Sequence, residues 1–114
     1  MEPFRITSDG PLVRVEIHGE FSLEFTDMLK RQLEPWLDSK SCQAVAIDLS
    51  ETTFMDSSGI GFLVAKASRL RSEGKAFYLL KPSPKVRRIL SLVKLERFFT
   101  SLDNDEELDK LLPH

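Results

Sequence analysis

This 114-residue chain has a single cysteine, two histidines and no apolar run longer than about five residues. A membrane-spanning helix takes roughly 20 apolar residues, so no segment of this sequence is expected to insert into a membrane. The lone Cys42 excludes an internal disulfide, and the first ten residues lack the charged and apolar regions of a signal peptide. We therefore expect a cytoplasmic protein.

The chain also lacks an excess of either charge. Its 16 basic and 18 acidic residues leave a formal net charge of −2, whereas general nucleic-acid-binding domains are usually basic. We therefore expect no direct contact with nucleic acid. Hydrophobic residues make up 41% and charged residues 30%, which is typical of a globular protein, and the length suits one domain over residues 1–114.

Few side chains are suited to catalysis. The only histidines are His18 and His114, and the serines at 57 and 58 do not lie in the G-x-S-x-G motif of a hydrolase nucleophile. The G-I-G at 59–61 is not followed by Lys-Ser/Thr, so it is not a phosphate-binding loop, and a nucleotide-binding role is disfavoured. We expect no enzymatic activity, no catalytic residue, no metal site and no cofactor.

Alternation and turn signals predict a hairpin followed by buried strands. Residues 3–7 favour a short edge strand, residues 9–10 (Asp-Gly) a turn, and residues 12–18 alternate apolar and polar side chains. Residues 44–49 are an apolar run without alternation, as in a strand covered on both faces, and residues 76–80 form another strand. A short final strand is expected within residues 97–102.

Apolar residues at helical spacing follow three serines. Helices are expected to begin near Ser22, Ser57 and Ser83, and Ser83 is an N-cap followed by a proline. In the first helix, Pro35 predicts a kink or break near residue 34, because proline lacks an N–H donor and clashes with the preceding turn. Trp36 of the same helix is expected in the core.

The second helix is predicted to bury one face and to place its basic residues elsewhere. Lys66, Arg69 and Arg71 fall on the other faces, and Gly74 is suited to the position just after the helix end. The apolar face consists of Ile60, Leu63, Val64, Ala67 and Leu70.

These elements predict an α/β fold with a small mixed sheet of four to five strands, packed with about four helices. The hairpin is antiparallel, and the later strands are joined through helices, which makes them parallel. Crossover helices in such a sheet begin at the carboxyl ends of the strands. The helix starts near Ser22, Ser57 and Ser83 are therefore expected at one edge, where an anion or a partner can bind.

The stretch FMDSSGIGFLVA, residues 54–65, places small polar residues between two apolar segments. Asp56 or Ser57 can cap the helix by accepting first-turn N–H groups. Gly59 and Gly61 fall in the first turn, although glycine costs a helix about 1 kcal/mol relative to alanine. Close packing of the helix on a strand explains such glycines, and so does close approach of another chain. The sequence alone leaves both explanations open.

In its longer context, DLSETTFMDSSGIGFLVA at 48–65, this stretch resembles the signature of the STAS domain family of anti-sigma-factor antagonists. VEIHGEF at 15–21 is similar to the family's strand that ends in G-E-[LI]. GKAFYLLKPSPKVRRIL at 74–90 is similar to its strand, loop and third helix. The resemblance covers nearly the whole chain, and it implies the STAS fold and a regulatory protein that acts by binding partners.

The resemblance implies a phosphorylation switch at Ser57. In the family, the first serine after the aspartate of this motif is phosphorylated by a partner kinase that is also the anti-sigma factor. The unphosphorylated domain binds the kinase and frees the sigma factor, and a phosphatase reverses the modification. At Ser22 the family often has an acid that the kinase contacts. The implied partner-binding residues are Glu20, Ser22, Asp56, Ser57, Ser58, Gly59 and Gly61.

A second interpretation stays open at this point. The same fold serves as a structural STAS subunit of transport or stress-sensing assemblies, where it docks on a larger complex. In that setting the serine at 57 can be silent.

Overall fold

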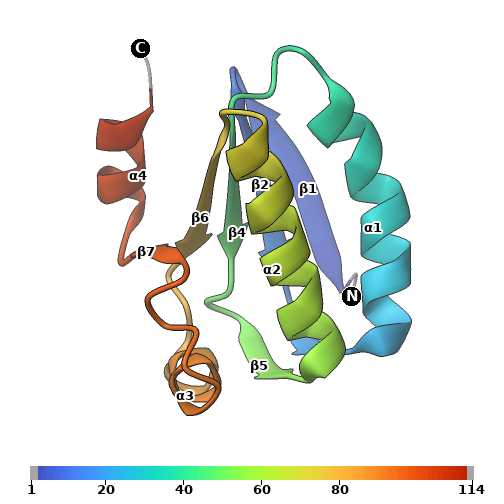
Figure 1. The fold of residues 1–114 in the computed structure, drawn as a ribbon, viewed down its shortest axis with the longest axis vertical. Helices are drawn as coiled ribbons and strands as arrows, with labels where there is room; N and C mark the ends of the chain where they lie inside the picture. The colour runs from blue at the N-terminus through green and yellow to red at the C-terminus, as the bar shows by residue number, and fades with distance from the viewer. Residues whose placement is uncertain (1–2, 113–114) are drawn as a thin grey trace.

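The computed structural model describes residues 3–112 (Figure 1). Residues 1–2 and 113–114, including His114, lie outside this range. The helices are α1 (Leu23–Asp38), α2 (Ser57–Ser72), α3 (Pro84–Leu92) and α4 (Asp105–Leu111). The strands are β1 (Phe4–Asp9), β2 (Leu12–Ile17), β3 (Gly19–Phe21), β4 (Ala44–Asp48), β5 (Thr52–Met55), β6 (Ala76–Leu80) and β7 (Thr100–Leu102).

The main sheet has five strands in the order β1-β2-β4-β6-β7, and β3 pairs with β5 in a separate two-stranded sheet. β1 and β2 form the predicted antiparallel hairpin, with Ile6 opposite Val15. The remaining neighbours, β2 with β4, β4 with β6 and β6 with β7, are all parallel. The predicted α/β fold with a mixed sheet is therefore confirmed.

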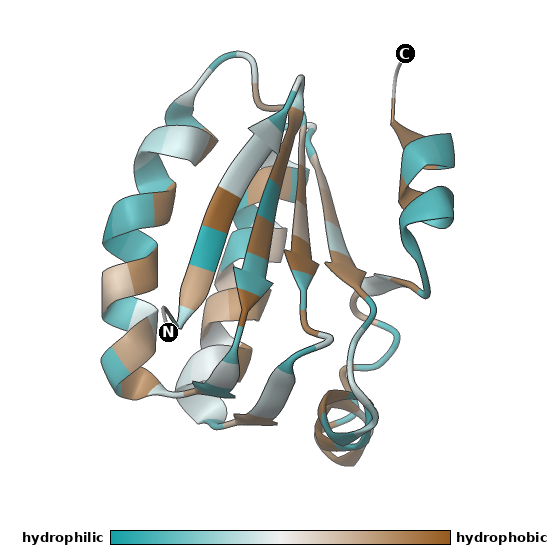
Figure 2. Cartoon of the chain, turned by 180° about the vertical axis from the view of Figure 1, so that it is seen from behind, coloured by the Kyte–Doolittle hydropathy of each residue, from teal (hydrophilic) through white to brown (hydrophobic). Residues whose placement is uncertain are grey.

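Strand β4 is covered on both faces, as its apolar run predicts. All five residues of β4 are buried. Val45 and Ile47 pack into the larger core with α1 and α2, whereas Ala44 and Ala46 belong to a second cluster on the opposite face, which Leu108 of α4 completes. Figure 2 shows the molecule from that opposite side, with the strands in front of α1 and α2.

The helix α1 is continuous through Pro35, so of the kink or break predicted near residue 34, the break is wrong (Figure 1). Pro35 lies on the exposed side of α1, where water can reach the Arg31 carbonyl that the missing N–H leaves without a helical partner.

Within residues 3–112, no helix has both the length and the apolar character needed to cross a bilayer.

The prediction that Trp36 lies in the core is also wrong. Its side chain is 37% exposed, and Met28 on the same side of α1 is 41% exposed. The sheet-facing stripe of α1 is already filled by residues spaced four apart, which leaves these two beside the edge strand β1. The buried members of that stripe are Phe25, Leu29, Leu33 and Leu37.

The expected position of Lys66 away from the buried face is wrong as well, since only 7% of this residue is exposed. Its ammonium donates to the Glu34 carboxylate of α1 and lies 5.6 Å from the centre of the Phe62 ring. Arg69, one turn further along α2, also donates to Glu34. These ion pairs join α1 to α2, and the partner of Lys66 is 32 residues away in the sequence.

We expect Glu34→Gln to lower the free energy of unfolding by about 1–3 kcal/mol, because it leaves the buried Lys66 ammonium without a counter-charge. Lys66→Met removes that charge, so the substitution at Glu34 is expected to cost less in the Lys66→Met background, where only its pair with Arg69 is lost. Urea unfolding of the wild type, both single variants and the double variant measures the coupling. An undiminished penalty in the Lys66→Met background would contradict the pairing.

The same pair predicts a loss of stability in acid. The hydrogen bond from Lys66 lowers the pKa of the Glu34 carboxyl below its ordinary 4.5. The stabilisation is therefore complete above that pH and is lost as the pH falls through the lower folded-state pKa. In urea unfolding across the acid range, the wild type is expected to lose stability more steeply than Glu34→Gln, and parallel curves would exclude this contribution.

Candidate functional site

The two-stranded sheet of β3 and β5 joins the segments that precede α1 and α2. Glu20 lies opposite Phe54 and Phe21 opposite Met55 in this parallel pair. Asp56 N–H then donates to the Phe21 carbonyl at 3.3 Å. The sequence analysis predicts no strand between residues 49 and 57, although Thr52-Thr53-Phe54 has the β-branched and aromatic composition of a strand.

Hydrogen bonds to Thr52 hold β5 in place. The Thr52 hydroxyl donates to the Ile17 carbonyl at 3.0 Å, and the Thr52 carbonyl accepts from the Ser83 hydroxyl at 2.8 Å. Ser83 is also the predicted N-cap of α3 and accepts from Val86 N–H at 3.3 Å. The starts of α1, α2 and α3 therefore lie along one edge of the domain, as predicted (Figure 1).

The turn between β4 and β5 is shaped by Asp48. Its Oδ1 accepts from Ser50 N–H at 3.0 Å and from the Ser50 hydroxyl at 2.7 Å, while Oδ2 accepts from Arg14 at 3.0 Å. Burial raises the pKa of the Asp48 carboxyl. The hydrogen bonds from Ser50 and Arg14 and the charge of Lys81 together lower the pKa by more than burial raises it, so it lies below its ordinary 3.8. The ionised carboxylate thus fixes the chain that leads into β5.

Asp56, rather than Ser57, caps α2. Asp56 Oδ1 accepts from Ser58 N–H at 2.9 Å and from Gly59 N–H at 3.1 Å. Ser22 precedes α1 with extended backbone angles, but its side chain makes no capping hydrogen bond. The sequence left Asp56 and Ser57 as alternative caps, and the structure assigns the role to Asp56.

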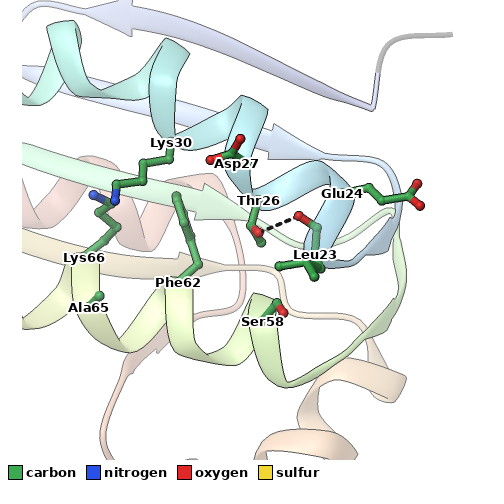
Figure 3. Close-up of a pocket in the computed structure, with 9 residues that line it drawn as sticks. All are labelled: Leu23, Glu24, Thr26, Asp27, Lys30, Ser58, Phe62, Ala65 and Lys66. Carbon is green, nitrogen blue, oxygen red and sulfur yellow. Dashed lines mark hydrogen bonds between the residues drawn. The ribbon is translucent and has the colours of Figure 1, made fainter.

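The two serines of the motif differ in exposure. Ser57 is the first residue of α2 and is exposed, whereas Ser58 is half-buried. Ser58 lines a groove between α1 and α2 together with Leu23 and Phe62 (Figure 3). A modifying enzyme can therefore approach the Ser57 hydroxyl from solvent, while the Ser58 hydroxyl faces the neighbouring helix.

Exposed apolar side chains lie on the segments that lead into α1 and α2. Leu23 at the start of α1 is 67% exposed, and Phe54 of β5 is 47% exposed. In the groove of Figure 3, Thr26 donates to the Leu23 carbonyl at 3.0 Å and so closes the first turn of α1. Across residues 3–112, no three histidine, cysteine or acidic side chains are grouped to hold a metal ion. The arrangement is suited to protein contact.

The two glycines of the motif have different surroundings. A Cβ at Gly59 would lie 2.7 Å from the Phe21 carbonyl oxygen and 2.7 Å from Met55 Cγ, so the helix packs on the strands at this point. A Cβ at Gly61 would meet nothing within 4 Å. Packing within the domain explains Gly59, whereas Gly61 leaves an exposed part of the helix without a side chain.

A sequence model of the STAS domain family matches residues 4–108. The chain belongs to the STAS domain family. It is 25% identical over 91 residues to an anti-sigma F factor antagonist of Paenibacillus polymyxa, a match covering 80% of this chain and 78% of that protein. It is 28% identical over 107 residues to a candidate anti-sigma factor antagonist of Thermotoga maritima, covering 94% and 93%.

The STAS fold is also evident from solved structures. The anti-sigma factor antagonist SpoIIAA in its unphosphorylated form is similar with a TM-score of 0.81 and 20% identity, covering 95% of each chain. Bacillus SpoIIAA in its phosphorylated form is similar with a TM-score of 0.76 and 19% identity, covering 96% of this chain and 99% of that one. At these identities the similarity shows a shared fold.

We expect opposite effects from alanine at the two glycines. Gly59→Ala should lower the free energy of unfolding by about 1–3 kcal/mol, because the new Cβ overlaps a backbone oxygen and must displace α2. Gly61→Ala should raise it by roughly 0.5–1 kcal/mol, since alanine favours the helix and the space is open. Chemical denaturation of both variants measures this, and equal effects would mean that the close contact at residue 59 is absent.

Proposed function

We propose that this STAS domain is an anti-sigma-factor antagonist whose partner-binding surface is the joined start of α1 and α2. Phosphorylation of Ser57 switches that binding off. The observation that carries the proposal is the position of Ser57, which is exposed at the first residue of α2 while the neighbouring Asp56 performs the capping. The serine therefore has no structural duty that a phosphate would disturb.

The relatives support the same function. The proteins from Paenibacillus polymyxa and Thermotoga maritima carry names of anti-sigma factor antagonists, and both match most of this chain. SpoIIAA, which has the same fold, exists in a phosphorylated form. The partners proposed for this chain are an anti-sigma factor that is also a serine kinase, and a phosphatase that restores the free serine.

A phosphate on Ser57 leaves the fold in place. It adds about −1.5 to −2 charges at neutral pH. The N-terminus of α2 stabilises negative charge by roughly 0.3–1 kcal/mol at an exposed position, whereas the adjacent Asp56 opposes it by like-charge repulsion. The two effects partly cancel, and Ser57 has no packing role to lose.

Binding of a partner is affected much more strongly. The exposed Leu23 and Phe54 suit an apolar contact, and the bare backbone at Gly61 allows a partner to approach α2 closely. A phosphate pressed into such a contact loses its water without gaining a cation, which costs about 2–5 kcal/mol. At about 1.4 kcal/mol per tenfold, this is a thirtyfold to several-thousandfold loss of affinity.

We expect a cognate anti-sigma kinase to modify Ser57 and not Ser58, because only Ser57 is exposed. Incubation with the kinase and ATP, followed by mass spectrometry, locates the phosphate. Ser57→Ala should abolish the modification, whereas Ser58→Ala should retain it. Phosphate on Ser58, or full modification of Ser57→Ala, would contradict the assignment.

Ser57→Asp is expected to weaken binding to the kinase by at least about tenfold while the circular dichroism spectrum stays native. Ser68→Asp is the matched control, since it places the same charge on an exposed position of α2, away from the helix start. Calorimetric titration of the three proteins decides the point. Equal affinities for wild type and Ser57→Asp would favour the alternative, a structural STAS subunit in which Ser57 is silent.

A further inference from the structure

The outer edge of β1 has no strand beside it among residues 3–112. β1 is the end strand of the main sheet. His18 N–H donates to the Pro3 carbonyl at 2.8 Å, so that carbonyl points toward the β2 side. Because the direction of backbone groups alternates along a strand, the N–H and C=O groups of Phe4, Ile6 and Ser8 point outward. The edge thus offers three consecutive sets of backbone donors and acceptors.

The side chains of β1 do not protect this edge. Natural edge strands are commonly blunted by lysines, prolines or bulges. β1 has no proline, and its register with β2 is continuous from Phe4 to Asp9. Its two charged residues, Arg5 and Asp9, have opposite signs and lie on the same face of the strand, one on each side of Thr7.

We propose that β1 pairs antiparallel with β1 of a second copy of this chain, around a two-fold axis at Thr7. The order of charges identifies the second copy as the occupant. Pairing centred on Thr7 places Arg5 opposite Asp9 of the second copy, and Asp9 opposite Arg5, so two cross-strand ion pairs form. The strand is therefore complementary in charge to itself.

The backbone agrees with this register. The same centre places Ile6 opposite Ser8 of the second copy, and both have outward-pointing backbone groups, so they form hydrogen-bonded pairs. Arg5 and Asp9 then occupy the other type of pair, in which side chains lie closer together. Pairing centred on Ile6 would instead place Arg5 opposite Thr7 and leave the charges unmatched.

The groove beside β1 fits the second strand. Met28 and Trp36 of α1 line this groove together with Phe4 and Ile6 of β1. The core leaves Met28 and Trp36 exposed. In the proposed register, Ser8 and Gly10 of the second copy come to this position. Their small size leaves room for the two large side chains, which the dimer covers.

The dimer leaves the proposed switch accessible. Ser57 is the first residue of α2, whereas the proposed pairing uses the outer edge of β1, the end strand of the main sheet. Two copies of the Ser57 surface are then held in one particle, which raises the avidity for any partner that has two matching sites. The dimer does not depend on the proposed function, since it uses none of the residues around Ser57.

Sedimentation equilibrium of the full chain over a concentration series tests the dimer. The wild type and Ser8→Ala are expected to self-associate, because alanine keeps the backbone N–H. Ser8→Pro removes that N–H in both copies and should weaken association at least about tenfold, while the outward direction of the group leaves the fold intact. Near-ultraviolet circular dichroism confirms the fold of each variant.

A wild type that stays monomeric at every concentration would overturn the proposal. The same result is expected if β1 pairs with a strand of another protein instead of a second copy. Ser8→Pro associating as tightly as Ser8→Ala would also overturn the proposal.

Cross-linking tests the register. Thr7→Cys places two cysteines at the axis, about 4.5 Å apart between Cα atoms, within the range of a disulfide. Ser8→Cys places them beyond about 7 Å, where a disulfide cannot form without backbone movement. The wild type is the control for Cys42, which is buried. Rapid oxidation of Thr7→Cys alone is expected, and equal rates for the two variants would exclude the axis at Thr7.

Discussion

The first turn of α2 packs so closely on β3 and β5 that only glycine fits at residue 59, and the site depends on this contact. Gly59 lies against the backbone of Phe21, whose ring packs edge-on against Phe25 of α1 at 5.2 Å and Phe62 of α2 at 5.6 Å. Phe21 of β3 thus joins both α1 and α2 to the two-stranded sheet. A displacement of α2 would separate Ser57 from the start of α1.

Capping and the proposed phosphorylation fall on neighbouring residues of the motif. Asp56 satisfies two first-turn N–H groups, which any helix start must pair. Ser57 is therefore available to change its charge without any change in the helix. In the proposed switch, this separation allows a bulky, charged phosphate to be added at the surface of a small domain whose stability rests on few contacts.

Most of the fold could be predicted from local patterns. The errors concern residues of α1 and α2 whose surroundings exist only in the folded chain. The hairpin, the buried strands and the three serine-led helix starts follow from periodicity and capping signals. Lys66 was misplaced because its partner Glu34 is on another helix, and Trp36 because its side of α1 meets the edge of the sheet. Pro35 was expected to kink or break the helix, but the helix continues, because the exposed position of Pro35 lets water replace the lost hydrogen bond.

The sequence by itself determined most of the secondary structure, the family resemblance and the motif that contains Ser57, because these depend on residues close together in the chain. Only the tertiary structure decided that β3 pairs with β5, that Gly59 is a packing requirement and Gly61 is not, and that the edge of β1 is open. Those features depend on which distant segments become neighbours. A Cβ at either glycine is equally acceptable to an isolated helix, and only the strand beneath residue 59 distinguishes them.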